Sequence, residues 1–113
     1  MKRGEIWTVA SGPDYAGKPR PAVIVQYDRF EMTASVTVCA FTSDPTEAPL
    51  FRLPIRPSAT NSLRAESRLM VDRIMTVPRA RLGLRVGRLS DMDMLRLNRA
   101  IVVFLGIGVA TQG

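Results

Sequence analysis

Hydrophobic and polar residues alternate with the period of two that is typical of β-strands along most of the chain. Glu5–Val9 is rich in β-branched and aromatic residues and predicts a first strand. Ala22–Gln26 is continuously apolar through Val25, which favours a strand buried on both faces. Ser35–Phe41 alternates, and Val36, Val38 and Ala40 share one of its faces.

The second half of the chain continues this pattern in shorter pieces. Phe51–Ile55 alternates apolar residues with Arg52, Pro54 and the following Arg56, and Pro54 indicates an edge strand because proline donates no ladder hydrogen bond. Arg68–Val71 predicts a further strand, which Asp72 closes. Leu82–Leu89 predicts the last one, with Gly83 and Gly87 as bends.

The period changes to that of a helix near the end of the chain. Ser90 and Asp93 resemble the two polar residues of a capping box, with Asp in place of the usual Glu or Gln. We therefore expect a helix whose apolar stripe packs one broad face on the sheet and whose end frays at the glycines. The stripe comprises Met94, Leu97, Ile101, Leu105 and Gly108, and the glycines are Gly106 and Gly108.

These elements predict an α+β fold that is mostly β. Five to seven short strands and one helix indicate a small, strongly bent antiparallel sheet or barrel with a C-terminal helix. The chain of 113 residues has no internal repeat or low-complexity segment. We expect one domain spanning residues 1–113.

The charge of the chain points to a polyanionic partner. Sixteen Lys and Arg residues against ten Asp and Glu residues give a net charge of +6, and Lys2 and Lys18 are the only lysines. A small, arginine-rich protein of this kind is suited to nucleic acid or to an acidic protein segment. Charge alone does not distinguish these two partners.

The absence of histidine excludes several classes of chemistry. Without His the chain has no Ser-His-Asp or Cys-His pair and no histidine-ligated metal. Cys39 is the only cysteine, so no intramolecular disulfide forms, and its place in an apolar run predicts a buried side chain. We expect neither a metal site nor a cofactor.

The apolar stretches are too short for a targeting or membrane-spanning segment. The longest run, 100–110, has 11 residues, whereas a spanning helix needs about 20. From this and the single cysteine we expect a cytoplasmic protein that does not associate with a membrane.

Arg20 lies between Pro19 and Pro21 at the start of an apolar run. Both prolines push Arg20 toward an extended backbone, so its charge is held in place before any ligand arrives. A fixed guanidinium suits a phosphate or a phosphorane. Taken alone, Arg20 is better explained as a solvated loop arginine, because arginine is mostly an exposed residue.

Several segments together resemble the MazF/PemK (Kid-like) toxins of bacterial toxin–antitoxin modules, over nearly the whole chain. They are Arg3-Gly4-Glu5-Ile6-Trp7, a Gly- and Pro-containing loop, Arg20-Pro21-Ala22-Val23-Ile24-Val25, a strand ending in Phe41-Thr42-Ser43, and Val71-Asp72 before Ile74-Met75-Thr76-Val77. The opening motif followed at a short interval by Arg-Pro and an apolar strand is the most specific of these.

The resemblance implies a sheet-based fold shared with the gyrase poison CcdB, and a homodimer. It also implies a metal-independent endoribonuclease that needs no cofactor and cuts single-stranded mRNA at short sequences. The 2′-hydroxyl would attack the adjacent phosphate, leaving a 2′,3′-cyclic phosphate and a 5′-hydroxyl. An acidic, partly disordered antitoxin would cover the RNA groove, in keeping with the positive charge of this chain.

The resemblance also suggests which residues act. Arg20 matches the active-site arginine of the family and Thr42 its strand-end hydroxyl, and Ser43 offers a second donor. Asp72 lies where some relatives use an acid, so it is a candidate acceptor for the 2′-hydroxyl proton. Asp72 is equally explained as an acid that orients Arg20 or ends a strand.

The loop before Arg20 departs from the family because it lacks the Glu-Gln or His-Glu-Gln element of relatives. It offers Tyr15 and Lys18 instead, and Tyr15 would either stack on an unpaired base or cover the core. Arg73 is a candidate RNA contact within a dispersed set of arginines that would otherwise be solvated surface. This set comprises Arg52, Arg56, Arg64, Arg68, Arg73, Arg79 and Arg81.

Three functions are therefore in view. The first is an mRNA-cleaving toxin, the second a non-catalytic inhibitor of DNA gyrase like CcdB, and the third a sheet protein that only binds RNA. Arg20 together with Thr42 favours the first, because a gyrase poison has no need of a hydroxyl beside that arginine.

Overall fold

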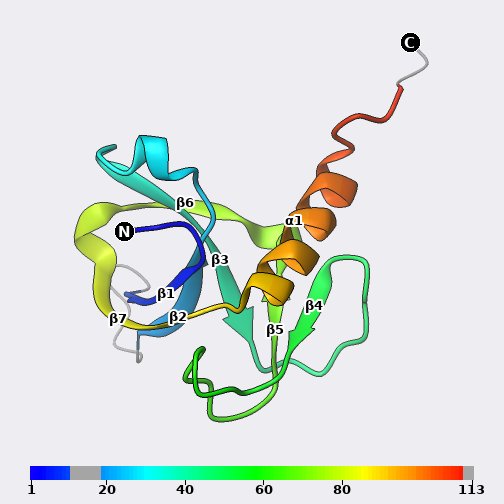
Figure 1. Cartoon of the computed structure of the whole chain (residues 1–113), viewed down its shortest axis with the longest axis horizontal. Coiled ribbons are helices and arrows are strands. Elements are labelled where there is room, and N and C mark those ends of the chain that lie inside the picture. Colours follow the sequence, from blue (N-terminus) through cyan, green and yellow to red (C-terminus); the bar gives the residue numbers. More distant parts are fainter. Residues whose placement is uncertain (11–18, 111–113) are drawn as a thin grey trace.

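The computed structural model describes residues 1–10 and 19–110, which form one bent antiparallel sheet and one α-helix (Figure 1). The seven strands are β1 (Glu5–Val9), β2 (Arg20–Ile24), β3 (Ser35–Thr42), β4 (Arg52–Ile55), β5 (Ser67–Met70), β6 (Met75–Pro78) and β7 (Leu82–Arg88). Three short 3-10 helices, η1 (Asp28–Phe30), η2 (Val71–Arg73) and η3 (Arg79–Arg81), connect strands, and α1 (Asp91–Leu105) ends the fold. The expected α+β class and the mostly β content are confirmed.

Strand β3 is the centre of the sheet. The strand order is β4-β5-β3-β2-β1-β7, and β6 also pairs with β3. On the side of β3 away from β2, β6 pairs with residues 35–38 and β5 pairs with residues 41–42. The short helix η2 connects β5 to β6, so these two strands pair with different halves of β3. The sheet bends between the two halves (Figure 1).

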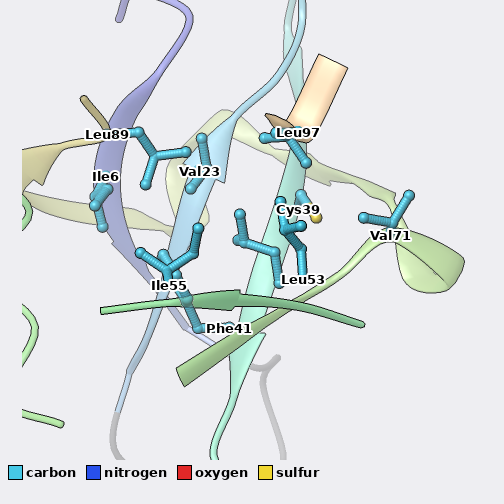
Figure 2. Close-up of a cluster of buried hydrophobic side chains, with 10 residues drawn as sticks. Ile6, Val23, Cys39, Phe41, Leu53, Ile55, Val71, Leu89 and Leu97 are labelled. Atoms are coloured by element: carbon cyan, nitrogen blue, oxygen red, sulfur yellow. The ribbon is translucent and has the colours of Figure 1, made fainter. Parts of the chain in front are cut away.

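The two faces of the sheet carry separate apolar clusters. The helix-side cluster lies between the sheet and α1 (Figure 2) and comprises Ile6, Val23, Cys39, Phe41, Leu53, Ile55, Leu69, Val71, Leu89 and Leu97. The open-face cluster lies on the opposite face and comprises Val9, Ala22, Ile24, Val36, Val38, Ala40 and Val77. Successive side chains of β2 and β3 point to alternate clusters, which confirms that β2 is buried on both faces.

Cys39 is fully buried in the helix-side cluster, as its place in an apolar run predicts. Burial raises the pKa of its thiol to about 12. The side chain is therefore protonated at neutral pH and acts as a small apolar residue.

Strand boundaries differ from the sequence expectation in three places. β2 begins at Arg20 and ends at Ile24, where Ala22–Gln26 was expected, because Arg20 pairs with Val9 and the Gln26 side chain bonds the Thr37 N–H. Phe51 precedes β4 in a turn, and Val71 opens η2 after β5. The edge position of β4 is confirmed.

Helix α1 begins as predicted and packs differently. The Ser90 hydroxyl accepts a hydrogen bond from the Asp93 N–H at 3.1 Å, while the Asp93 carboxylate binds Arg96 and does not complete a capping box. Leu97 is the only fully buried helix residue. The expectation that one broad face packs on the sheet holds through Ile101, which packs against the helix-side cluster with Met94 and Ala100. It is wrong for Leu105, which is exposed where the end of α1 projects from the sheet (Figure 1).

The exposed second half of α1 is apolar. Its exposed side chains, with those just beyond the helix, are Val102, Val103, Phe104, Leu105, Ile107 and Val109. The helix does not fray as expected: Gly106 takes a left-handed conformation with φ of 68° and closes it, and the Ile107 N–H donates to the Val102 carbonyl at 3.0 Å.

The turn after β4 is held by a buried amide that the sequence pattern did not indicate. Asn61 accepts from the backbone N–H groups of Ser58 and Leu63 and donates to the Arg56 carbonyl. The carbonyl groups of Thr60 and Asn61 lie against Gly87 of β7, and the Arg88 N–H donates to Thr60. This turn therefore anchors the end of the sheet to β7.

No helix among the described residues is long and apolar enough to cross a membrane.

Candidate functional site

A small pocket lies where β2 begins and β3 ends. It has a volume of about 170 Å³ and is lined by Arg20, Pro21, Phe41, Thr42, Ser43 and Ser67. Arg20 is exposed, Thr42 is half-buried and Ser43 is exposed. One cation and three hydroxyl groups therefore border the same space.

The pairing of β2 with β3 explains why Arg20 and Thr42 meet. The two strands are antiparallel, with Ala22 opposite Ala40. Two residues further along each strand, the same register brings Arg20 and Thr42 to neighbouring positions. Because side chains two apart share a face, both residues lie on the face of the open-face cluster, which contains Ala22 and Ala40.

The Thr42 hydroxyl is oriented by the backbone that follows it. Its oxygen accepts a hydrogen bond from the Asp44 N–H at 3.1 Å. A hydroxyl that accepts in this way keeps its own hydrogen free to donate. Thr42 is therefore a positioned donor at the mouth of the pocket.

Asp44 supports the turn beside Thr42. Its carboxylate accepts from the Thr46 N–H at 2.9 Å and from the Thr46 hydroxyl at 2.7 Å, and these bonds lower the pKa of the Asp44 carboxyl. The Arg68 guanidinium donates to the Asp44 carbonyl at 3.4 Å. Arg68 stands opposite Thr42 in the register of β3 with β5, so a second cation flanks this hydroxyl.

Asp72 is bound to Arg52, which was not expected as its partner. Arg52 Nε lies 2.8 Å from Asp72 Oδ1, and Nη2 lies 3.1 Å from Oδ2. The guanidinium lowers the pKa of the Asp72 carboxyl. With both oxygens occupied by a cation, the carboxylate orients Arg52, and the alternative that it orients Arg20 finds no support in these contacts.

A second, apolar cavity adjoins Arg20 on the open face of the sheet. It has a volume of about 230 Å³, and Arg20 and Arg81 are its only charged lining residues among those the structure describes. The rest of the lining is apolar and comprises Val9, Ala10, Ala22, Ala40, Phe41, Met70, Met75 and Val77. Arg20 thus borders both cavities.

The structure brings together some of the residues expected at the site and separates others. Arg20, Thr42 and Ser43 line one pocket, whereas Asp72 and the exposed Arg73 lie on η2 and do not line it. Tyr15 and Lys18 lie outside the described residues. Ser67 was missed by sequence reasoning, and only the pairing of β5 with the end of β3 reveals it.

The arrangement suits an anionic group with several oxygen atoms. A guanidinium gives planar, charge-assisted donors, and the neighbouring hydroxyls add neutral ones. In residues 1–10 and 19–110 no three acidic or cysteine side chains are grouped as metal ligands would be. The chemistry of the described pocket is therefore that of binding and stabilising negative charge.

Comparison with known proteins gives one consistent answer. Residues 2–105 match the family model described as PemK-like, MazF-like toxin of type II toxin–antitoxin system. A protein named probable endoribonuclease MazF from Mycolicibacterium smegmatis is 53% identical over 107 residues, which cover 95% of this chain and 98% of that protein.

Solved structures share the fold. An endoribonuclease in complex with its cognate antitoxin, from a mycobacterial species, superposes with a TM-score of 0.77 at 22% identity, covering 97% of this chain and 99% of that one. A MazE–MazF structure from Deinococcus radiodurans gives a TM-score of 0.76 at 15% identity, covering 96% and 98%.

Proposed function

The chain belongs to the PemK-like, MazF-like toxins of type II toxin–antitoxin systems, and we propose that it is an endoribonuclease that cuts single-stranded mRNA at short sequences. The observation that carries this proposal is the shared pocket of Arg20 and Thr42. When the 2′-hydroxyl of RNA attacks the neighbouring phosphate, a fixed cation and a hydrogen-bond donor stabilise the charge on the phosphate oxygens. Arg20 and Thr42 can supply both without a metal or an imidazole.

Arg20 and Thr42 have distinct roles in the proposed reaction. The ribose 2′-hydroxyl gives up its proton to water as its oxygen attacks the neighbouring phosphorus, and the bond from phosphorus to the 5′-oxygen breaks. The 5′-oxygen takes up a proton from water, so the products are a 2′,3′-cyclic phosphate and a 5′-hydroxyl. Negative charge grows on the phosphorane oxygens in the transition state. Arg20 meets it with a fixed cation, and the Thr42 hydroxyl donates a hydrogen bond to it.

The serines of the pocket are proposed to hold the RNA backbone. Ser43 follows Thr42 at the strand end, and Ser67 closes the pocket from β5. Neutral hydroxyls bind phosphate and sugar oxygens without reading the base. Lys18 and Tyr15 remain proposed RNA contacts from the sequence, as does Arg73 on η2.

Asp72 is proposed to act through Arg52. The guanidinium binds both oxygens of Asp72 and lowers the pKa of its carboxyl, so the carboxylate is a weak proton acceptor. Asp72 therefore holds Arg52 as a further cation for the RNA backbone. The sequence hypothesis that Asp72 accepts the 2′-hydroxyl proton stays a prediction, and the rate of an Asp72→Asn variant distinguishes the two roles.

We propose an acidic antitoxin as the protein partner of this chain. The net charge of +6 and the exposed Arg20 guanidinium in the pocket favour an acidic segment that covers the RNA site. The relatives from mycobacteria and Deinococcus radiodurans were solved with an antitoxin, which supports the same partner class here.

The active form is proposed to be a homodimer, with the exposed apolar half of α1 in its interface. Contiguous apolar surface of this kind is unusual on a monomer and is typical of protein interfaces. A second copy related by a two-fold axis would present the same patch and cover it. We also propose that residues 1–113 act as one domain and that the site of action is the cytoplasm, where mRNA is found.

A gyrase inhibitor like CcdB is not favoured. The family match and the named endoribonuclease relatives point to the RNA-cleaving branch of this fold. The pocket agrees, because a protein that acts only by binding has no use for a hydroxyl positioned beside Arg20.

The test is cleavage of a long single-stranded RNA by the purified protein in EDTA. We expect cuts that leave 5′-hydroxyl ends, and we expect a 2′-deoxy nucleotide at the cut position to prevent cleavage there. Arg20→Ala should lower the rate at least about a hundredfold, and Thr42→Val about tenfold or more, because each removes a donor to the phosphorane.

Arg29→Ala is the matched control for Arg20→Ala, because it removes the same charge from an exposed position on η1, away from the pocket and from the proposed interface. Its rate should equal that of the unchanged protein. Intact RNA in every reaction, or full activity of Arg20→Ala, would contradict the proposed function. Binding without cuts would support the RNA-binding alternative.

A further inference from the structure

The apolar cavity beside Arg20 is placed to receive a part of the substrate other than the phosphate. Arg20 and Phe41 line both this cavity and the pocket with Thr42, so the two spaces lie next to each other on either side of these side chains. A phosphate held between Arg20 and Thr42 would therefore carry its attached nucleoside toward the cavity. This inference rests on the proposed function and deepens it.

Strand β1 ends in the middle of the cavity and separates its two arginines. Val9 pairs with Arg20 of β2 on one side and with Leu82 of β7 on the other. The Ala10 N–H donates to the Arg81 carbonyl at 2.9 Å, which fixes the backbone of Arg81 at the far side. Neighbouring strands lie about 4.8 Å apart, so roughly 10 Å separate the two backbones that carry the guanidiniums.

The lining of the cavity matches a flat aromatic ring. Its walls are aliphatic and thioether side chains, among them Ala22, Ala40, Met70, Met75 and Val77. Thioether sulfurs make favourable contacts with aromatic rings, and unpaired bases gain stability by leaving water for such surfaces. The volume of about 230 Å³ is below the range of roughly 300–1,000 Å³ that takes drug-sized ligands, and suits a single base.

The polar groups of the cavity select among bases. Guanidinium groups donate and do not accept hydrogen bonds. Guanine presents the O6 oxygen and uracil the O4 oxygen at the position where adenine and cytosine present an amino group. An amino group facing a guanidinium leaves two donors opposed, whereas an oxygen accepts from it.

We propose that the cavity is a nucleobase subsite next to the scissile phosphate, and that Arg81 favours guanine or uracil over adenine and cytosine there. Arg20 binds the phosphate and Arg81 contacts the exocyclic oxygen of the base. The apolar walls hold the ring without distinguishing one base from another. Sequence preference at this position thus comes from one side chain.

The first test compares cut sites. The 5′ ends of products from a random-sequence RNA are mapped for the unchanged protein and for Arg81→Gln. Glutamine both donates and accepts, so it tolerates an amino group. We expect guanine or uracil to be enriched at one nucleotide adjoining the cut, and we expect Arg81→Gln to reduce that enrichment about ten- to a hundredfold while it admits adenine or cytosine.

Arg29→Gln is the control, because it removes the same charge from an exposed position on η1. It should leave the base distribution unchanged. A variant that merely disturbed the fold would slow all sites together and keep the base preference. If Arg81→Gln keeps the preference while Arg20→Ala abolishes cutting, the base subsite is wrong and the proposed function stands.

The second test does not depend on cutting. Uncleavable 2′-deoxy oligonucleotides of random sequence carrying 4-thiouracil are photo-crosslinked to the protein, and the attached residues are found by mass spectrometry. We expect crosslinks to Met75, Met70 or Arg81, and their loss on competition with unmodified RNA. Crosslinks confined to other surfaces would overturn the proposal of a nucleobase subsite. If an acidic antitoxin peptide crosslinked to the cavity residues instead, the cavity would be assigned to the protein partner.

Discussion

Two arginines of the sheet, Arg52 and Arg20, differ in their hydrogen-bond partners. Arg52 is tied to Asp72 by two hydrogen bonds. Arg20 lies at the mouth of two cavities, and no carboxylate of residues 1–10 or 19–110 forms an ion pair with it. A guanidinium whose donors are not spent on the protein can bind a phosphate at no cost in broken ion pairs. Among residues 1–10 and 19–110, Arg20 thus has no acidic partner, and this, together with its place beside Thr42, supports its proposed role as the group that meets the substrate.

The pair of Asp72 and Arg52 predicts a pH-dependent contribution to stability. Because Arg52 lowers the pKa of the Asp72 carboxyl in the folded protein, the pair stabilises fully above the carboxyl pKa of the unfolded chain. The stabilisation is lost as the pH falls through the lowered folded pKa. At pH 7 we expect Asp72→Asn to lower the free energy of unfolding by about 1–2 kcal/mol. This loss lies between the losses typical of breaking a fully exposed ion pair and of breaking a fully buried one.

Urea unfolding at pH 7 and at about pH 3 measures this effect, since the ordinary carboxyl pKa is about 3.9. The difference between Asp72→Asn and the unchanged protein should shrink at the lower pH. An equal difference at both pH values would contradict the ion pair. The same variant should cut RNA less than tenfold more slowly if Asp72 acts through Arg52, and about a hundredfold more slowly or worse if it accepts a proton.

At the scale of elements, β7 depends on glycine where it meets other backbone. A Cβ at Gly87 would lie 2.7 Å from the Thr60 carbonyl oxygen and 2.8 Å from that of Asn61. Both carbonyls belong to the turn that the buried Asn61 holds in place. The glycine therefore permits the close approach that anchors β7 to this turn.

We expect Gly87→Ala to lower the free energy of unfolding by about 1–3 kcal/mol, because backbone atoms must move to admit the methyl group. Gly83→Ala is the comparison, since its Cβ would meet the Thr8 hydroxyl, a side-chain atom that can rotate away at the cost of the one hydrogen bond it accepts from the Leu84 N–H. Thermal unfolding of both variants should show the larger loss for Gly87→Ala. A larger loss for Gly83→Ala would show that the turn yields more easily than the Thr8 hydroxyl.

The elements also show which features the sequence could predict. β1, β3 and β7 were predicted because their alternation or β-branched residues are clear, and the start of α1 because Ser90 is a strong N-cap. β6 was not identified as a strand from pattern, because Met75–Pro78 holds a single buried residue, Val77. The end of α1 was misjudged because apolar spacing indicates a face to be buried but not the partner that buries it.

The candidate site was predictable in part for a similar reason. Arg20 and Thr42 could be named from motifs. They lie at the ends of the neighbouring antiparallel strands β2 and β3, and the pairing of these strands brings them together. The positions of Ser67 and of the Asp72–Arg52 pair depend on which strand pairs with β3 on the side away from β2. That choice is made by long-range packing, which the local sequence does not record.

At the scale of the whole molecule, the exposed apolar end of α1 is the surface that the fold leaves uncovered. Val103 is 61% exposed and contacts no buried cluster, so its size and polarity are unconstrained within one chain. The proposed homodimer gives this surface a partner. The same arrangement would place basic residues of two copies on one particle, which increases its attraction for RNA.

Val103→Glu should therefore weaken the homodimer without unfolding the chain. We expect sedimentation to give about twice the chain mass of 12.5 kDa for the unchanged protein and a shift toward one chain mass for Val103→Glu. Met32→Glu, which replaces a side chain that is 88% exposed near η1, is the control and should remain dimeric. A dimeric Val103→Glu protein would exclude this end of α1 from the interface.

The meeting of Arg20 and Thr42 depends on the ladder between β2 and β3, because each residue is the terminal one of its strand. If the ladder slipped by one residue, one of the two side chains would turn to the opposite face of the sheet. A nascent or misassembled copy would then carry all the reactive groups and still be harmless. If Arg20 and Thr42 act as proposed, cutting therefore begins only when β2 and β3 have paired in their native register.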